Sequence, residues 1–188
     1  MDGLQRYWPL RPVQSMAVGF DLIPGRKIPP VHRTALFSRD RRFRYRLGRR
    51  WGDGAAACFV LLNPSTADAT KDDPTVRRCI GFARGLGYGA LEVVNLYAYV
   101  ATYPTELRQA GYPVGRYNDR HIEAAARECE RVVLAWGVHA AKLRRPQEVL
   151  ELLQGLDVEP HCRRLTASGH PEHPLRLPLG CGAGAVRG

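Results

Sequence analysis

The stretch that decides the fold reads Ala57-Cys58-Phe59-Val60-Leu61-Leu62-Asn63-Pro64-Ser65-Thr66-Ala67-Asp68. The unbroken apolar run at residues 57–62 is typical of a strand that is buried on both faces of a sheet. The polar residues 63–68 are typical of a turn at the end of that strand. Because strands buried on both faces occur mainly in parallel sheets covered by helices, the segment predicts an α/β protein.

Three further apolar runs repeat this pattern, and each is followed by a polar loop. They lie at residues 91–94, 132–136 and, more weakly, 161–165. The four runs start roughly 30–40 residues apart, which is the spacing of strand-helix-strand units. We predict helices between them, after Asp73-Pro74, Asn118-Asp119 and Pro146, where capping residues or prolines precede apolar residues at helical spacing. The expected fold is a three-layer α/β/α arrangement around a central, mainly parallel four-stranded sheet.

An N-terminal β-hairpin is expected ahead of this sheet. Residues 34–37 and 42–47 would form its strands, and residues 38–40 its turn. Three arginines alternate with apolar residues in the second strand, so they should share one face: Arg42, Arg44 and Arg46. Such a row of guanidinium groups suits contacts with nucleic-acid phosphates. A solvated arginine-rich hairpin explains the same pattern equally well.

The composition fits one domain with a basic N-terminal extension. A chain of 188 residues, 45% of them hydrophobic, can bury one sizeable core. Of the net charge of +10, residues 1–50 carry +9 and the rest carries +1. We expect residues 1–33, which prolines interrupt, to form an irregular basic arm. Residues 34–180 would form a single α/β domain, and residues 181–188 a flexible tail.

The sequence also bears on compartment and on cofactors. No stretch approaches the roughly 18 apolar residues of a membrane span, and the first 20 residues lack a signal peptide's apolar core. The cysteines are dispersed and form no Cys-x-x-Cys pair, so most should be small buried hydrophobes: Cys58, Cys79, Cys129, Cys162 and Cys181. We expect a cytoplasmic protein without a metal, a cofactor or a membrane partner, and we favour a monomer.

The candidate site consists of the loops that follow the four apolar runs. Ligands of open parallel sheets bind at the carboxyl ends of the strands, where these loops meet. Asn63 is the sharpest candidate because Pro64 biases it toward an extended backbone that aims its amide out of the strand end. A plain turn explains the same residues. The other candidates from these loops are Pro64, Ser65, Asp68, Asn95, Tyr97, His139, His173 and Leu175.

Three acidic residues follow Asn63 closely. Asp73 is best explained as the N-cap of the helix that begins at Pro74. Asp72 is most simply a solvated charge. Asp68 has no obvious structural role, so it is a candidate general base.

The region from residue 34 to about residue 178 resembles a bacterial family of proteins of unknown function. The segments that carry the resemblance are Leu62-Asn63-Pro64-Ser65-Thr66-Ala67-Asp68, Asp72-Asp73-Pro74-Thr75, Val94-Asn95-Leu96-Tyr97 and His173-Pro174-Leu175. This resemblance names a family without an activity.

The order of the loops is also similar to that of the uracil-DNA glycosylase superfamily. The likeness implies that Asn63 positions the attacking water and that Asn95 reads the edge of the base. Trp136-Gly137-Val138-His139-Ala140 matches a further motif of that superfamily. His173 would stabilise charge on the departing base, and Leu175 would fill the stack when a base flips out.

Three functions stay open. The first is recognition of a nucleobase, with hydrolysis of an N-glycosidic bond in the manner of a DNA glycosylase. The second is an enzyme that acts on a free nucleotide or another small metabolite. The third is a non-catalytic protein that binds nucleic acid through the hairpin arginines and the basic arm. The expected partner is accordingly DNA or a nucleotide.

Overall fold

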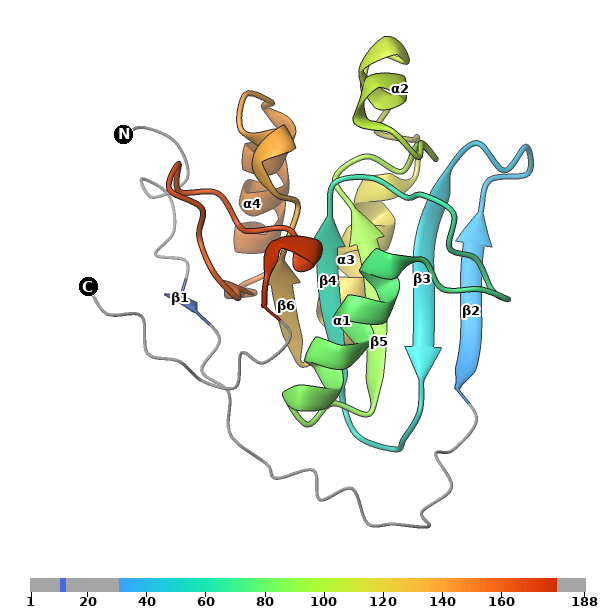
Figure 1. The fold of residues 1–188 in the computed structure, drawn as a ribbon, viewed down its shortest axis with the longest axis vertical. Helices are drawn as coiled ribbons and strands as arrows, with labels where there is room; N and C mark the ends of the chain where they lie inside the picture. Colours follow the sequence, from blue (N-terminus) through green and yellow to red (C-terminus); the bar gives the residue numbers. More distant parts are fainter. Residues whose placement is uncertain (1–10, 13–30, 179–188) are drawn as a thin grey trace.

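The computed structural model describes residues 11–12 and 31–178. Their strands form one mixed seven-stranded sheet in the order β1-β7-β6-β4-β5-β3-β2 (Figure 1). The predicted tail and most of the predicted arm lie outside the described residues. Within that arm, β1 (Arg11–Pro12) pairs with β7, and β2 begins at His32.

Five strands of the sheet are parallel to one another: β1 and the four strands that the apolar runs predict. These four are β4 (Ala56–Leu61), β5 (Ala90–Asn95), β6 (Arg131–Leu134) and β7 (Pro160–Cys162). The carboxyl ends of β4, β5 and β6 therefore lie at the same edge of the sheet (Figure 1). The loops that leave these ends meet at that edge.

The hairpin is part of this sheet, so the expectation of a separate four-stranded sheet is wrong. β2 (His32–Phe37) and β3 (Arg44–Arg50) pair antiparallel, and β3 pairs antiparallel with β5. The physical reason is that β3 is buried, with Leu47 fully inaccessible to solvent and opposite Val93 of β5.

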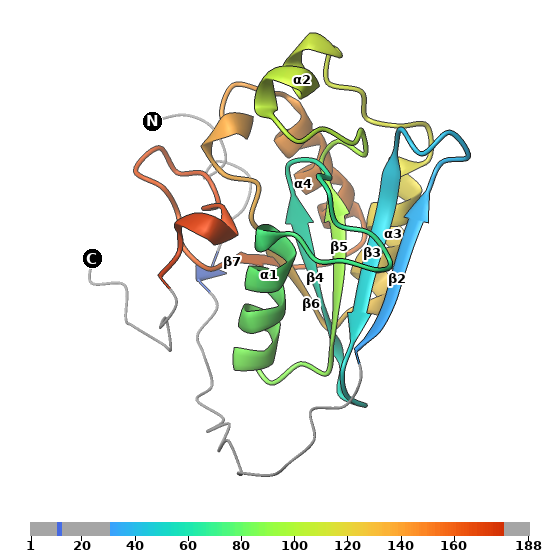
Figure 2. The same ribbon diagram turned by 45° about the vertical axis from the view of Figure 1, so that its right-hand side comes forward.

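Helices cover both faces of the sheet and make three layers (Figures 1 and 2). α1 (Pro74–Gly85) packs on one face, and α3 (Asn118–Glu128) and α4 (Arg145–Gly155) pack on the other. As predicted, the side chain of Asp73 caps α1, accepting a hydrogen bond from the backbone N–H of Val76 at 2.8 Å. α2 (Pro104–Gln109) lies beyond the carboxyl ends of the strands (Figure 1). Two short 3₁₀ turns, η1 (Val138–Ala140) and η2 (Pro174–Arg176), lie in later loops.

The described cysteines behave as predicted. Cys58, Cys79, Cys129 and Cys162 are buried free thiols, and Cys181 lies outside the described residues. None of the helices within the described part of the chain has the length and apolar character needed to span a membrane.

Candidate functional site

A cavity of about 970 Å³ opens at the carboxyl ends of β4 and β6. This volume is at the upper end of the range for small-molecule sites. Its walls come from the loops after β4, β5, β6 and β7, from the first turn of α1 and from Arg44 of β3. Five predicted site residues line it: Asn63, Ser65, His139, His173 and Leu175. The parallel topology thus brings together residues that are far apart in the sequence.

Hydrogen bonds fix the orientation of the Asn63 amide. Its Nδ2 donates to the backbone oxygen of Pro64 at 2.9 Å and to that of Ala101 at 2.7 Å. Pro64 is buried and does not line the cavity, and its oxygen also accepts from the backbone N–H of Ala101. Among the described residues no group donates to Oδ1 of Asn63, so this oxygen is available as an acceptor.

His173 is a neutral imidazole with a defined tautomer. Its Nδ1 accepts a hydrogen bond from the backbone N–H of Leu175 at 3.3 Å, so the ring proton lies on Nε2. Burial lowers the pKa of His173, and His139 and Arg176 act in the same direction against Asp73. Gly137 packs tightly against it: a Cβ at Gly137 would lie 3.0 Å from the Cβ of His173. The ring therefore offers an N–H donor at neutral pH.

Five charged side chains that the sequence did not assign to the cavity also line it: Arg44, Asp73, Arg164, Glu172 and Arg176. Only 2% of Arg44 is exposed, and its Nη1 donates to the backbone oxygen of Ala67 at 2.8 Å. Burial lowers the pKa of Arg44 to about 10, while the charge of Asp73 opposes this shift. The sequence does contain a signal that Asp73 lines the cavity. Its carboxylate caps the first helix after β4, and that helix begins at the edge of the sheet where ligands bind.

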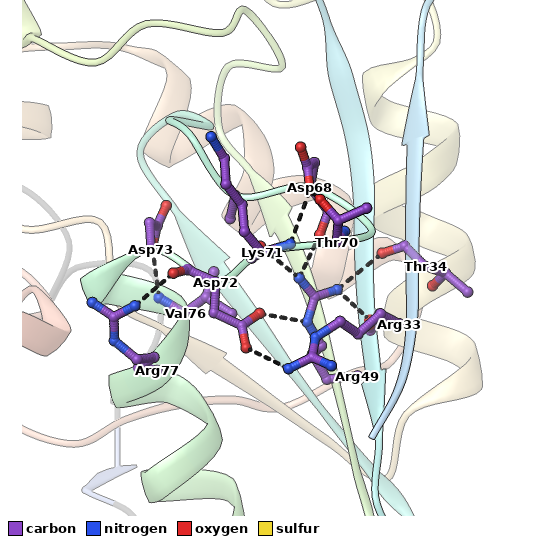
Figure 3. A network of polar contacts seen from close by, with 12 residues as sticks. Arg33, Thr34, Arg49, Asp68, Thr70, Lys71, Asp72, Asp73, Val76 and Arg77 are labelled. Carbon is purple, nitrogen blue, oxygen red and sulfur yellow. Dashed lines mark hydrogen bonds and ion pairs between the residues drawn. The ribbon is translucent and has the colours of Figure 1, made fainter. Parts of the chain in front are cut away.

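Arg49 anchors the loop that joins β4 to α1 (Figure 3). Its fully buried side chain donates to the carboxylate of Asp72 at 2.7 Å and to the backbone oxygens of Asp68 and Lys71 at 2.6 and 3.2 Å. Asp72 also pairs with Arg33 at 3.3 Å. The interpretation of Asp72 as a solvated charge is therefore wrong, because its carboxylate ties the loop to the sheet.

Asp68 closes its own turn and does not line the cavity. Its carboxylate accepts hydrogen bonds from the hydroxyl and the backbone N–H of Thr70, both at 2.7 Å, and from the backbone N–H of Lys71 at 3.0 Å (Figure 3). These bonds lower the pKa of Asp68 to about 2. A carboxylate with so low a pKa is a weak proton acceptor, and the structure gives it a role in shaping the loop.

Asn95 and Tyr97 are buried and do not line the cavity. Asn95 ends β5 opposite Leu61, and neither polar atom of its amide has a hydrogen-bond partner among the described residues. Tyr97 packs against Tyr112 with ring centroids 5.3 Å apart, and burial raises its pKa to about 12.

The three hairpin arginines do not share a face, so the predicted row does not form. Arg44 is buried behind the loop after β4, whereas Arg46 pairs with Glu92 at 3.2 Å and Glu128 at 2.6 Å. Arg42 is exposed over the ring of Tyr99. The cause is a register shift: Phe37 pairs with Arg44 but Leu36 pairs with Arg46, which leaves one extra residue in β3 and breaks the alternation.

We expect Asp73→Ala to lower the free energy of unfolding by about 1 kcal/mol, because the backbone N–H of Val76 loses its acceptor. Asp73→Ser keeps a capping oxygen and should stay near the wild-type value. Urea denaturation of the three proteins measures both effects. Equal losses in the two variants would contradict the capping role.

Metal-ligand side chains do not gather in the described part of the chain. Within residues 11–12 and 31–178, no group of three or more His, Cys, Asp and Glu residues is placed to hold a metal ion.

Comparison with known proteins places the chain in a family. No curated protein and no solved structure matches it. Residues 44–175 match a family described as protein of unknown function (DUF1643). The match covers more than two thirds of the chain and includes the residues of the cavity from Arg44 to Leu175. The chain therefore belongs to the DUF1643 family of proteins of unknown function.

Proposed function

We propose that the cavity binds a nucleobase and that the protein hydrolyses an N-glycosidic bond there. The observation that carries this proposal is the pairing of two groups in one cavity: an oriented amide with an available Oδ1, from Asn63, and a neutral imidazole with its proton on Nε2, from His173. A mixed sheet whose central strands β4, β5 and β6 are parallel, between two helical layers, also supports it. The similarity of the loop order in the sequence to that of the uracil-DNA glycosylase superfamily is a further support.

The proposed reaction assigns each group one task. Oδ1 of Asn63 accepts a hydrogen bond from a water and holds it beside the anomeric carbon. The water oxygen forms a bond to that carbon as the carbon–nitrogen bond breaks, and the base departs with the electron pair. The N–H of His173 donates to the departing base and stabilises its charge. An amide is no base, so the water's proton passes to solvent or to the product.

The rim of the cavity supports the same class of substrate. Leu175 is 49% exposed beside His173, which suits contact with an unstacked base. Asn95 has no task in the proposal because its amide is buried outside the lining of the cavity.

Base release tests the proposal directly. Oligonucleotides and nucleosides that contain uracil or other modified bases are incubated with the protein, and the free base is measured by chromatography. We expect Asn63→Ala to lower the rate about 100-fold, because a misplaced water loses its alignment. Ala69→Ser, an exposed change in the same loop, should leave the rate unchanged. No release from any substrate would refute the proposed reaction.

A free nucleotide is the second candidate ligand. The cavity is large enough for one, and the guanidinium of Arg176 lines it without a hydrogen bond or ion pair to any described residue. A nucleotide that raises the melting temperature but loses no base would favour this candidate, because a ligand stabilises the folded state by mass action.

A further inference from the structure

A second feature lies on the surface beside the cavity. It comprises the β2–β3 hairpin loop, residues 99–103, and the chain that leads into α3. We call it the basic–aromatic surface, and its residues are Arg39, Arg41, Arg42, Phe43, Tyr99, Tyr103, Arg116, Tyr117 and Arg120. All five of these arginines are exposed. The hairpin loop lies at the same edge of the sheet as the carboxyl ends of β4 and β5 (Figure 1).

Ring contacts join the parts of this surface. The ring of Phe43 lies 5.8 Å from that of Tyr99 and 6.4 Å from that of Tyr45. Tyr45, which is buried beneath, lies 6.2 Å from Tyr117. A continuous series of rings therefore connects the hairpin to the start of α3.

Aromatic rings, and not carboxylates, hold three of the arginines. The guanidinium carbons of Arg41, Arg42 and Arg116 lie 4.1, 5.8 and 5.4 Å from the ring centroids of Phe37, Tyr99 and Tyr117. Stacking on a ring leaves the N–H donors of a guanidinium free and its charge uncompensated.

None of the five arginine side chains forms a hydrogen bond or an ion pair with a described residue. Arg46, Arg49 and Arg145, by contrast, all pair with carboxylates. Asp40 lies in the same hairpin loop, but its carboxylate accepts from the hydroxyl of Ser38 at 2.6 Å and from the backbone N–H of Arg42 at 3.2 Å. The surface thus keeps a net positive charge, because the carboxylate of Asp40, whose charge acts on Arg42, offsets only one of the five arginines.

The backbone at Arg41 is strained, as it is at Tyr112 and Asp157. The φ of Arg41 is +57°, in the left-handed region that glycine and asparagine adopt more easily. Strained residues of this kind cluster at functional sites. Glycine would relieve this strain, so Arg41→Gly removes the side chain without adding backbone strain.

The surface continues to the mouth of the cavity. The backbone N–H of Val100 donates to the oxygen of Arg42 at 2.9 Å, and the next residues, Ala101 and Thr102, line the cavity. Tyr103 follows and is 64% exposed, and Tyr117 is 43% exposed. Exposed rings stack on unpaired bases, whose faces are accessible only in a single strand.

We propose that the basic–aromatic surface binds the phosphate backbone of a single-stranded nucleic acid and leads the strand to the cavity. The arginines contact the phosphates, and the exposed tyrosines stack on bases. Delivery of a base for cleavage rests on the proposed function, but binding to the surface does not, because the surface and the reacting groups are different residues.

Fluorescence anisotropy with labelled dT15, rU15 and a 15-base-pair duplex tests the proposal across a salt series. We expect Arg42→Gln/Arg116→Gln to weaken single-strand binding at least tenfold. The slope of log K against log salt should fall by about 1.4, or about 0.7 for each lost phosphate contact. Arg41→Gly should also weaken binding without lowering the melting temperature, because glycine relieves the left-handed backbone.

A control variant matches the loss of charge. Arg50→Gln/Arg127→Gln removes two exposed arginines from the last residue of β3 and the last turn of α3, away from the hairpin loop, and should bind within twofold of wild type. Equal losses in both double variants would mean that net charge alone drives binding, which overturns the proposal. Absence of single-strand binding, or preference for the duplex, also overturns it.

The outcomes separate this inference from the proposed function. Binding of dT15 or rU15 supports the surface, and their relative affinity identifies DNA or RNA as the partner. Asn63→Ala should bind like wild type. Intact binding without base release from any substrate refutes only the reaction, whereas release from a nucleoside without strand binding refutes only the surface.

Discussion

Replacement of Arg49 by methionine is expected to lower the free energy of unfolding by about 3–5 kcal/mol. The guanidinium is fully buried and donates to the carboxylate of Asp72 and to four backbone oxygens, those of Thr34, Gly48, Asp68 and Lys71. Methionine fills similar space but satisfies none of these acceptors. Asp72, whose side chain is 12% exposed, keeps only the longer contact with Arg33. Removal of one partner from a buried ion pair lowers the free energy of unfolding by more than the intact pair adds to it, because the other partner is left buried and unpaired.

Urea denaturation measures this effect, and two variants control it. Arg49→Lys keeps the charge but not the planar fork, so it should lose part of the stability. Arg50→Met changes the neighbouring exposed residue and should cost less than about 0.5 kcal/mol. A loss below about 1 kcal/mol in Arg49→Met would show that the loop does not depend on this anchor.

The elements that the sequence predicts well are those whose signals are local. The apolar run at residues 57–62 becomes β4, and Asp73 with Pro74 starts α1 as cap and first residue. The sequence does not predict α2, because this helix has only six residues and no apolar stripe. Its start depends on a hydrogen bond from the backbone N–H of Tyr103 to the carboxylate of Glu106.

The position of the hairpin in the sheet depends on contacts with residues that are distant in the sequence. Arg44 and Arg49 appear as exposed charges in the sequence, but they are buried because Ala67 and Asp72 supply acceptors for them. No pattern within β3 shows those acceptors. The one-residue register shift beside Leu36 is likewise set by strand pairing.

Some features of the candidate site are likewise predictable from the sequence, and others are not. Strand order alone predicts that the loops bearing Asn63 and His173 meet. It does not predict which side chain of a loop faces the cavity. Asp68 and Asp73 both follow β4, yet Asp68 is used within its turn and Asp73 lines the cavity. Asn95 ends its strand at the correct edge, but its side chain is buried away from the lining.

Replacement of His173 by alanine is expected to lower base release about 10²–10³-fold, the usual cost of removing a donor that faces developing negative charge. The variant loses the Nε2 proton that the hydrogen bond from Leu175 to Nδ1 defines. His139 lines the same cavity from an exposed position, so His139→Ala serves as the matched histidine control and should lose far less. Equal losses in both would contradict a specific role for His173.

The pH dependence gives a second readout of the same group. Burial places the pKa of His173 below its usual value of 6.5, so the ring is neutral at pH 7 and stays neutral somewhat below 6.5. Protonation would add a proton on Nδ1, which already faces the N–H of Leu175, and would break that contact. The wild-type rate should therefore be constant around pH 7 and fall only on the acid side of 6.5. The residual rate of His173→Ala should lack that fall.

Gly137→Ala tests the position of the ring without changing its chemistry. Gly137 has a φ of +77°, which an alanine adopts only with strain. An added Cβ would also lie 3.0 Å from the Cβ of His173, so the methyl group must displace the loop that carries His173. We expect a loss of rate between those of His139→Ala and His173→Ala. Because the imidazole is retained, a displaced ring should still titrate, and less complete burial should move the acid-side fall toward pH 6.5. An unchanged rate and profile would mean that catalysis does not require the ring where Gly137 holds it.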